Sequence, residues 1–380
     1  MLASTRKNGS QNSLTPLREF LLLLALAAAC AGPARPASAQ DPLDWSVPPI
    51  DPTRLSSLPL RSSDARVPEP GRWRVEGTLG YFNLASPSWH ITAIHSEYER
   101  DGQPVTSDEL RVLETRHPSD EIYNLDVEGW QLDVNVSRNL GRGYALSLHI
   151  PWMEVGSPHW DAISSEFHHI FGIGQGPRDI LASGQTMVYV YSDGRYVERS
   201  HELVGSGVAD VSLAVSGPIG RALGASHRWA GVVEAPTGDR DGLWGSGGWD
   251  LGLRWFGDWR WSRWRIHAAA AYNWLDDSGG WLGIERADTW QTQAEVFFRI
   301  ADGASLRASL WYGSSPLADF SDGAPGDPSP FLDLGAHFRI ASRWWIAANL
   351  GENHVSYGTT PDFTLQLQLG ASLGRDRSPP

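Results

Sequence analysis

Polar side chains that could bind a ligand gather in one segment outside the regular parts of the chain. This segment, Phe167–Asp179, reads FHHIFGIGQGPRD, and its glycines permit a tightly folded backbone. Such a loop could hold polar groups over the mouth of a fold, because loops commonly carry binding residues. A structural loop that packs on its own apolar side chains is the interpretation we favour. The candidate ligand-binding residues are His168, His169, Gln175, Arg178 and Asp179.

The sequence contains no strong metal, nucleotide or cofactor signal. His168 and His169 are adjacent, and neighbouring side chains rarely converge on one ion without more distant ligands. The glycines between Gly172 and Gly176 lack the G-x-G-x-x-G spacing of a dinucleotide-binding loop. We therefore predict no metal site and no cofactor.

A membrane-embedded, lipid-modifying hydrolase is the enzymatic alternative. It needs a serine and a histidine oriented by a third polar group, all close together at one rim of the fold. Asn353, His354 and Ser356 are the best local candidates, yet all three are ordinary loop residues. We predict that the protein is not an enzyme and keep the hydrolase as an alternative.

A second set of candidate ligand-binding residues lies where apolar and polar residues alternate along the chain. A period of two indicates a β-strand with one apolar and one polar face. Charged groups on the polar face could contact a small polar solute or could neutralise one another as a structural network. The candidates at these polar positions are Arg254, His267, Glu295, Arg307, His337 and Arg339.

The clearest strand pair runs from Gly129 to Trp152. Apolar residues occupy every second position in both halves, and the tripeptide Gly141-Arg142-Gly143 between them suits the positive φ angles of a tight hairpin. Aromatic residues begin or end the apolar rows, as in outer-membrane barrels that carry rings at both edges of an apolar band. The pair therefore indicates two adjacent strands of such a barrel.

The same alternation recurs along most of the chain and predicts about twelve strands in total. A further hairpin is expected at 186–191 and 196–201, and the segment 88–127 fits either short strands or an elaborated loop. The predicted strands contain Trp73–Asn83, Trp130–Val136, Tyr144–Trp152, Val211–Val215, Trp229–Val233, Trp249–Trp255, Trp264–Trp274, Trp290–Ile300, Leu306–Tyr312, Leu332–Ile340, Trp344–Leu350 and Phe363–Leu369.

Connection lengths support a barrel, because bacterial outer-membrane barrels have short periplasmic turns and long outer loops. Shorter connections near 141–143, 217–226, 257–263, 301–303 and 341–343 alternate with longer ones at 154–207, 236–248, 275–288, 313–330 and 351–362. Strands of about nine to eleven residues also match a tilted membrane span. We predict an all-β fold: a single antiparallel transmembrane β-barrel of about twelve strands, within a range of about ten to sixteen. A secreted, soluble β-sandwich binding module is the alternative fold.

Residues 1–39 read as a secretion signal. Basic residues precede the apolar run from Phe20 to Ala29, and Ala37-Ser38-Ala39 provides a cleavage site. Cleavage near Ala39 would remove Cys30, the only cysteine of the 380-residue chain. We expect a proline-rich periplasmic arm or partial plug at 40–71, the barrel at 72–373 and a polar tail at 374–380.

The composition favours strands and excludes one class of partner. The chain has 19 Trp, 40 Gly and 25 Pro and a formal net charge of −13 at pH 7. Such an acidic chain is a poor candidate for nucleic-acid binding. Its excess carboxylates either keep a secreted protein soluble in transit or line a cation-favouring pore.

The most distinctive motifs point to a known family. They are FHHIFGIGQGPRD at 167–179, VGSGVADVSLAV at 204–215, and APTGD followed by GSGGWDL within 235–251, together with the hairpin at 129–152. On these residues the chain resembles an uncharacterised proteobacterial family of outer-membrane proteins known only as a domain of unknown function. The resemblance covers most of the chain and implies a secreted β-barrel, with no activity or ligand attached.

These observations lead to a functional hypothesis. We expect a barrel in the outer membrane of a Gram-negative bacterium that acts as a channel or small-solute-binding transport barrel. Its expected partners are outer-membrane lipid, the barrel-assembly machinery and a small polar solute. The tail GRDRSPP stands where barrel proteins generally present a terminal aromatic residue to that machinery.

Overall fold

Twelve antiparallel strands form one closed ring in the computed structural model, which describes residues 43–48, 50, 58–98, 102–156, 182, 185–200, 203–242, 244–276, 283–353 and 361–373. The ring closes where the last strand pairs with the first, from Trp73 with Leu373 to Asn83 with Phe363. The predicted barrel and its strand number are therefore confirmed. The ring strands are β1 (Trp73–Pro87), β2 (Ile122–Gly141), β3 (Tyr144–Val155), β7 (Val211–Ala222), β8 (Ala225–Ala235), β9 (Asp250–Trp261), β10 (Trp264–Trp274), β11 (Thr289–Ala301), β12 (Ala304–Gly313), β13 (Ser329–Ala341), β14 (Trp344–Glu352) and β15 (Phe363–Leu373).

The barrel exposes its apolar side chains and buries its polar ones. On β13, Leu332 and Leu334 are 39% and 56% exposed, whereas the intervening Asp333 is 5% exposed. The same inversion holds on β15, where Leu367 and Leu369 are exposed while Gln366 and Gln368 are buried. A soluble sandwich would bury the apolar rows between two sheets, so the single closed ring excludes that alternative.

Two-residue turns join the strands at one end of the barrel. Arg142 and Gly143 join β2 to β3, and Leu223 and Gly224 join β7 to β8, all with positive φ angles. Primed turns of this kind match the twist of paired strands. The other three turns also contain two residues each, since the strands on either side are longer than those predicted from the sequence. The longer connections start and end at the opposite end of the barrel.

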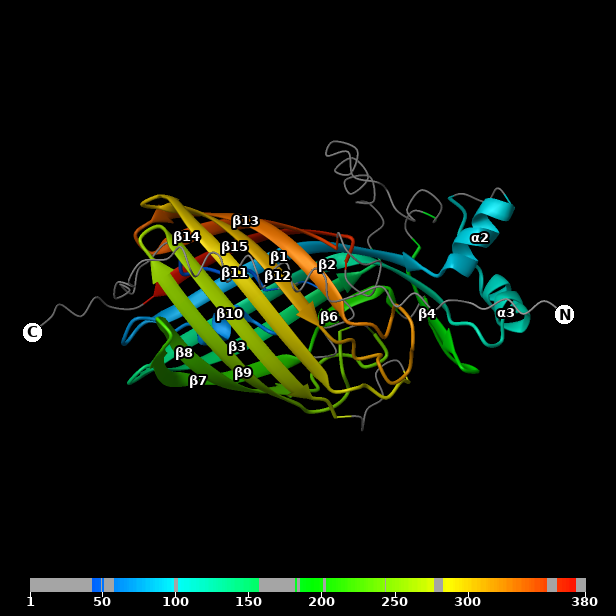
Figure 1. The fold of residues 1–380 in the computed structure, drawn as a ribbon, viewed down its shortest axis with the longest axis horizontal. Helices are drawn as coiled ribbons and strands as arrows, with labels where there is room; N and C mark the ends of the chain where they lie inside the picture. Colours follow the sequence, from blue (N-terminus) through cyan, green and yellow to red (C-terminus); the bar gives the residue numbers. More distant parts are fainter. Residues whose placement is uncertain are drawn as a thin grey trace, which may run out of the picture.

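Two short helices form a cap beyond the end with the long connections, as Figure 1 shows. The segment 88–121 contains α2 (Trp89–Glu97) and α3 (Ser107–Arg116), so the expectation of short strands or a loop there was wrong in part. Helix α3 starts with a capping box in which Thr106 and Glu109 bind each other's backbone amides. This local signal, and not strand alternation, decides the conformation.

The cap is completed by strands that extend the barrel wall. β4 (Met187–Ser192) pairs with residues 122–126 of β2, and β5 (Arg195–Arg199) pairs with β4, which places the predicted hairpin outside the ring. β6 (Gly205–Val208) pairs with the end of β3. Helices and strands share one apolar cluster, which contains Ile91, Leu110, Leu113, Met187 and Tyr189. Within the described residues, neither helix has the length and hydropathy of a membrane span.

The described residues of the segment before β1 contact the inner wall of the barrel. Trp45 and Leu43 pack with Phe297, Leu58 packs with Ala214 and Val232, and the turn η2 (Ser62–Ala65) approaches β7 and β8. Glycines of the inner row face these apolar residues. A Cβ atom built on Gly80 would lie 1.8 Å from Ile50, and one on Gly335 would lie 2.9 Å from the Trp45 ring. The wall is therefore shaped to the side chains that it encloses.

Candidate functional site

Charged residues of the lumen form several groups, and the first is centred on Asp64 of the N-terminal arm. Asp64 is fully buried; it accepts a hydrogen bond from Arg254 of β9 and lies 2.8 Å from Nε2 of His149 on β3. Arg254 also donates to the carbonyl of Pro59 at 2.9 Å. Because a buried guanidinium needs a charged partner, the arm supplies a carboxylate to one of the predicted wall residues.

The second group joins three neighbouring strands on the inner wall. Arg307 of β12 donates to Glu295 of β11 at 2.8 Å and lies 2.7 Å from a carboxylate oxygen of Asp333 on β13. The guanidinium of Arg307 also lies over the ring of Trp45, 5.7 Å from its centroid. Both predicted residues, Glu295 and Arg307, are thus held in a buried network that touches the arm.

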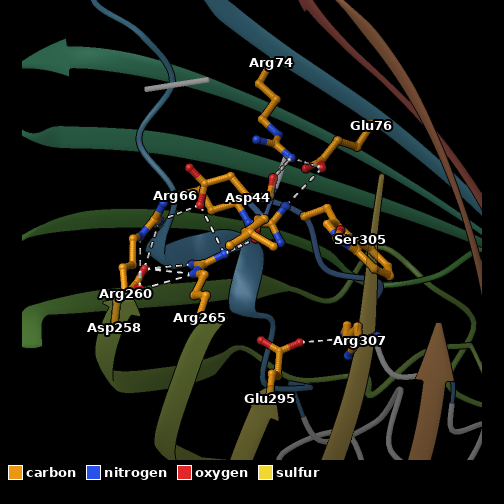
Figure 2. Close-up of polar contacts among 12 residues, drawn as sticks. Asp44, Arg66, Arg74, Glu76, Asp258, Arg260, Arg265, Glu295, Ser305 and Arg307 are labelled. Carbon is orange, nitrogen blue, oxygen red and sulfur yellow. Dashed lines mark hydrogen bonds and ion pairs between the residues drawn. The ribbon is translucent and has the colours of Figure 1, made fainter. Parts of the chain in front are cut away.

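The third group is rich in arginine and is drawn in Figure 2. Arg260 and Arg265 each bind both Asp44 and Asp258, at distances between 2.7 and 3.1 Å. In the same view Arg66 and Arg74 converge on Glu76, at 3.2 and 2.8 Å. Asp44 and Arg66 come from the arm, and the remaining five residues come from β1, β9 and β10. The arm and the wall therefore share one ion-pair network.

A cavity of about 860 Å³ opens beside this third group. Its wall includes the short turns at 221–226 and 341–345, so it lies at the short-turn end of the barrel. Nine arginines line it, against three carboxylates: Arg66, Arg72, Arg74, Arg221, Arg228, Arg260, Arg265, Arg339 and Arg343, with Asp44, Glu69 and Asp258. The cavity is strongly cationic although the chain as a whole is acidic.

The structure brings the predicted strand residues into the lumen. Arg254, His267, Glu295, Arg307 and His337 are all buried there, and His337 stacks on Trp45 with ring centroids 5.4 Å apart. Arg339 is exposed and lines the cavity together with His267 and His337. The five loop candidates, His168, His169, Gln175, Arg178 and Asp179, lie outside the described residues.

The hydrolase candidates gain no support from the described residues. Asn353 donates a hydrogen bond to Asp362 at 2.9 Å, which ties the end of β14 to the start of β15. His354 and Ser356 lie outside the described residues. Asn353 therefore has a structural contact at the rim, in keeping with an ordinary loop residue.

The charged residues of the arm were not predicted from the sequence. Asp44, Arg61, Asp64 and Arg66 stand in a proline-rich segment without periodicity, so no pattern placed them in the lumen. Buried tryptophan and leucine in that segment, at Trp45, Leu58 and Leu60, were the available signal. Large apolar residues in a fully solvated arm are unusual, and these three are 0% exposed.

One group in the cap could hold a metal ion. His90 of α2, His117 at the end of α3 and Asp120 each offer a ligand atom, and these atoms lie within 4.8 Å of one another. A carboxylate oxygen of Asp120 lies 3.0 Å from Nε2 of His90 and 3.4 Å from Nδ1 of His117. The hydrogen bond with His90 is the main reason why the pKa of Asp120 is lowered, so its charged form is favoured.

Comparison with protein families gives a match over most of the barrel. The model of a family of proteins of unknown function, DUF3187, matches residues 116–372, which is more than half of the chain. The chain belongs to this family. No curated protein matches the sequence.

Comparison with solved structures finds matches of low sequence identity. The COG4313 outer membrane channel from Pseudomonas putida F1 is 13% identical; the alignment covers 83% of this DUF3187 chain and 100% of that channel, with a TM-score of 0.49. A FadL homologue from Pseudomonas aeruginosa is 12% identical, with 90% and 100% coverage and a TM-score of 0.36. The KdgM porin in complex with disordered oligogalacturonate is 8% identical, with 65% and 93% coverage and a TM-score of 0.36.

Proposed function

We propose that this DUF3187 protein is an outer-membrane barrel that transports a small polar solute. One observation carries the proposal: apolar side chains cover the outside of a closed ring while polar and charged side chains face its interior. Hydrocarbon can solvate the first surface, and only water or a polar solute suits the second. A polar lumen enclosed by an apolar band is the architecture of a channel.

The N-terminal arm acts as a plug in this proposal. Its backbone and side chains bind the wall from several sides, since Leu60 N donates to Gln291 at 2.5 Å and Ser62 Oγ lies 2.8 Å from Gln293. Trp45 Nε1 donates to Ser305 at 2.9 Å on β12. A solute can pass only where this packing opens, so movement of the arm controls transport.

A cysteine pair that locks the arm to the wall tests the proposal. Ser62→Cys and Gln293→Cys replace two hydrogen-bonded side chains, and a short thiol-specific crosslinker with a reducible disulfide joins them, because cysteine is shorter than glutamine. The only natural cysteine lies in the predicted signal. The purified double variant is reconstituted in planar bilayers, and conductance is recorded before and after reduction. We expect conductance to rise on reduction, because the released arm can leave the lumen.

Each single-cysteine variant serves as a control, because it cannot form the intramolecular bridge. A heat-dependent shift in gel migration verifies that every variant is a folded barrel. If neither the reduced double variant nor a variant lacking residues 40–71 conducts, the transport proposal is wrong. If the double variant conducts equally in the oxidised and reduced states, the channel function stands but the arm does not act as a plug.

A further inference from the structure

We propose that the cationic cavity at the short-turn end binds small anions that carry carboxylate or phosphate groups. The proposal rests on the transport function, since it names the class of solute that the barrel takes. The nine arginines around about 860 Å³ exceed the three carboxylates by far. Guanidinium groups bind carboxylate and phosphate oxygens through paired hydrogen bonds, which makes arginine the preferred residue for such ligands.

Two of the three cavity carboxylates are shared between arginines, and the third, Glu69, pairs with Arg72. Asp44 and Asp258 each bind both Arg260 and Arg265. Glu76, just behind the cavity wall, binds both Arg66 and Arg74. Four guanidinium groups therefore surround three carboxylates, and the excess positive charge increases toward the turns.

Arg228 of β8 provides the clearest unused charge. It donates to the carbonyl of Gly143 at 2.7 Å and to Ser216 at 3.4 Å, and no carboxylate of the described chain pairs with it. Arg221 adds a second, exposed guanidinium at the same turn. Buried Nε atoms of Arg66, Arg74 and Arg228 find no acceptor among the residues that the structure describes. An anion in the cavity would supply acceptor oxygens to these donors.

Binding is measured on the full chain, purified in detergent, by titration calorimetry with citrate and with inorganic pyrophosphate. Arg228→Gln and the double variant Arg221→Gln/Arg228→Gln remove charge from the cavity. Arg142→Gln is the matched control, because Arg142 lies in a turn at the same end but outside the cavity. We expect Arg228→Gln to weaken binding about tenfold, the effect of losing one hydrogen bond to a charged group, with a larger loss in the double variant.

The same oxygen chemistry could come from a lipid headgroup, so the titrations are repeated in nanodiscs. A phosphatidylglycerol headgroup that occupies the cavity would compete with citrate, so citrate would bind more weakly in phosphatidylglycerol discs than in phosphatidylcholine discs. This difference between the discs should be smaller for Arg228→Gln, because the variant also weakens headgroup binding. Citrate binding that is equal in both discs assigns the site to a soluble anion. Absence of binding by citrate, pyrophosphate and phosphatidylglycerol overturns the proposal, as does an equal loss in Arg142→Gln.

Failure of this site can be told apart from failure of the transport function. The reduced cysteine-pair variant conducts or does not conduct whatever the anion affinity is. Conductance without anion binding would show that the anion-site proposal is wrong and that the channel proposal holds. Anion binding without conductance would show that the barrel binds a solute but is not a channel.

A different observation carries a second proposal: we infer that His90, His117 and Asp120 bind a divalent transition metal on the cap. Two imidazole nitrogens and a carboxylate oxygen suit zinc and its neighbours, with a position left for water. In a tetrahedral zinc site with bonds of about 2.0–2.1 Å, ligand atoms lie about 3.3 Å apart. The separations of 3.0 and 3.4 Å from Asp120 to the two histidines approach that spacing, and all three ligand atoms lie within 4.8 Å of one another.

Zinc binding to the EDTA-treated full chain tests the second proposal, with cobalt absorption as the spectroscopic readout of imidazole ligation. Asp120→Asn and His117→Ala should each weaken zinc binding at least about tenfold, the loss found even for outer-shell partners. His227→Ala is the matched control, since His227 lies at the other end, beside Trp255. Undiminished affinity in Asp120→Asn, or no binding to the unchanged chain, would overturn the site.

Discussion

At the scale of single residues, Asp64 holds the arm inside the barrel. Its carboxylate is the partner of Arg254 and a neighbour of His149, and all three side chains are buried. By contrast, Glu69 of the same arm pairs with Arg72 at 2.8 Å nearer the surface. Removing one partner of a buried pair leaves an uncompensated charge, whereas surface pairs contribute little.

We predict that Asp64→Asn releases the arm without unfolding the barrel. An unpaired buried charge costs about 3–5 kcal/mol, and water in the lumen reduces this loss. If the arm loses even about 2 kcal/mol of its docking free energy, the population with an undocked arm rises about 30-fold. Tryptic cleavage after Arg61 and Arg66 should accelerate accordingly, and gel migration should still shift on heating.

Glu69→Gln is the matched control, because it neutralises a carboxylate of the same arm outside the buried group. Its cleavage rate should stay within about threefold of that of the unchanged protein, because the Glu69–Arg72 pair is partly open to solvent, where the loss of an ion pair costs less. Equal acceleration in both variants would show that net charge, and not the Asp64 contact, retains the arm.

At the scale of elements, inner-row glycines make the strands complementary to the arm. Gly80 on β1 faces Ile50, and Gly252 on β9 faces Leu58, whose nearest atom would lie 2.8 Å from an added Cβ. Gly77, on the opposite face of β1, has nothing within 4 Å of an added Cβ. One strand therefore offers a tight and an open glycine position.

We predict that Gly80→Val displaces the first part of the arm, whereas Gly77→Val does not. Valine suits a strand, so both variants should fold, but the side chain at residue 80 would occupy the position of Ile50. Hydrogen exchange of residues 43–50 should become faster in Gly80→Val alone. Unchanged exchange in Gly80→Val would mean that the arm tolerates the added volume.

Prediction from sequence succeeded for the strands, including the hairpin β4–β5 of the cap, and failed for the two helices of the cap, for a physical reason. A strand that lies between lipid and lumen must alternate at every position, so the rows at 211–215 or 363–369 could be recognised individually. Helices α2 and α3 pack on β4 and β2, and their apolar residues follow contacts with distant segments. The Thr106–Glu109 capping box was nevertheless readable from the sequence alone.

At the scale of the whole molecule, stability depends on which surface meets hydrocarbon. Leu334, near the middle of β13, is 56% exposed on the apolar face. Leu223 is 91% exposed in a short turn. Leu334→Arg therefore places a charge within the apolar band, whereas Leu223→Arg places the same charge at the edge of the band.

We predict that Leu334→Arg lowers the free energy of unfolding from lipid vesicles by about 2–4 kcal/mol, the cost of an arginine at the bilayer midplane. Leu223→Arg should change it by about 1 kcal/mol or less, as at an interface. Denaturant titration followed by heat-dependent gel migration measures both values. Equal values, or recovery of the unchanged protein in the soluble fraction of cells, would contradict the membrane location.

The sequence by itself determined the barrel, because alternation and connection length are local properties that lipid imposes on each strand separately. It also identified wall residues such as Arg254 and Glu295 as facing the lumen. Only the tertiary structure decided what these residues meet. Asp64 lies 190 positions before Arg254, and the nine arginines of the cavity come from the arm, the strands and their turns, so ring closure and docking of the arm together assemble them.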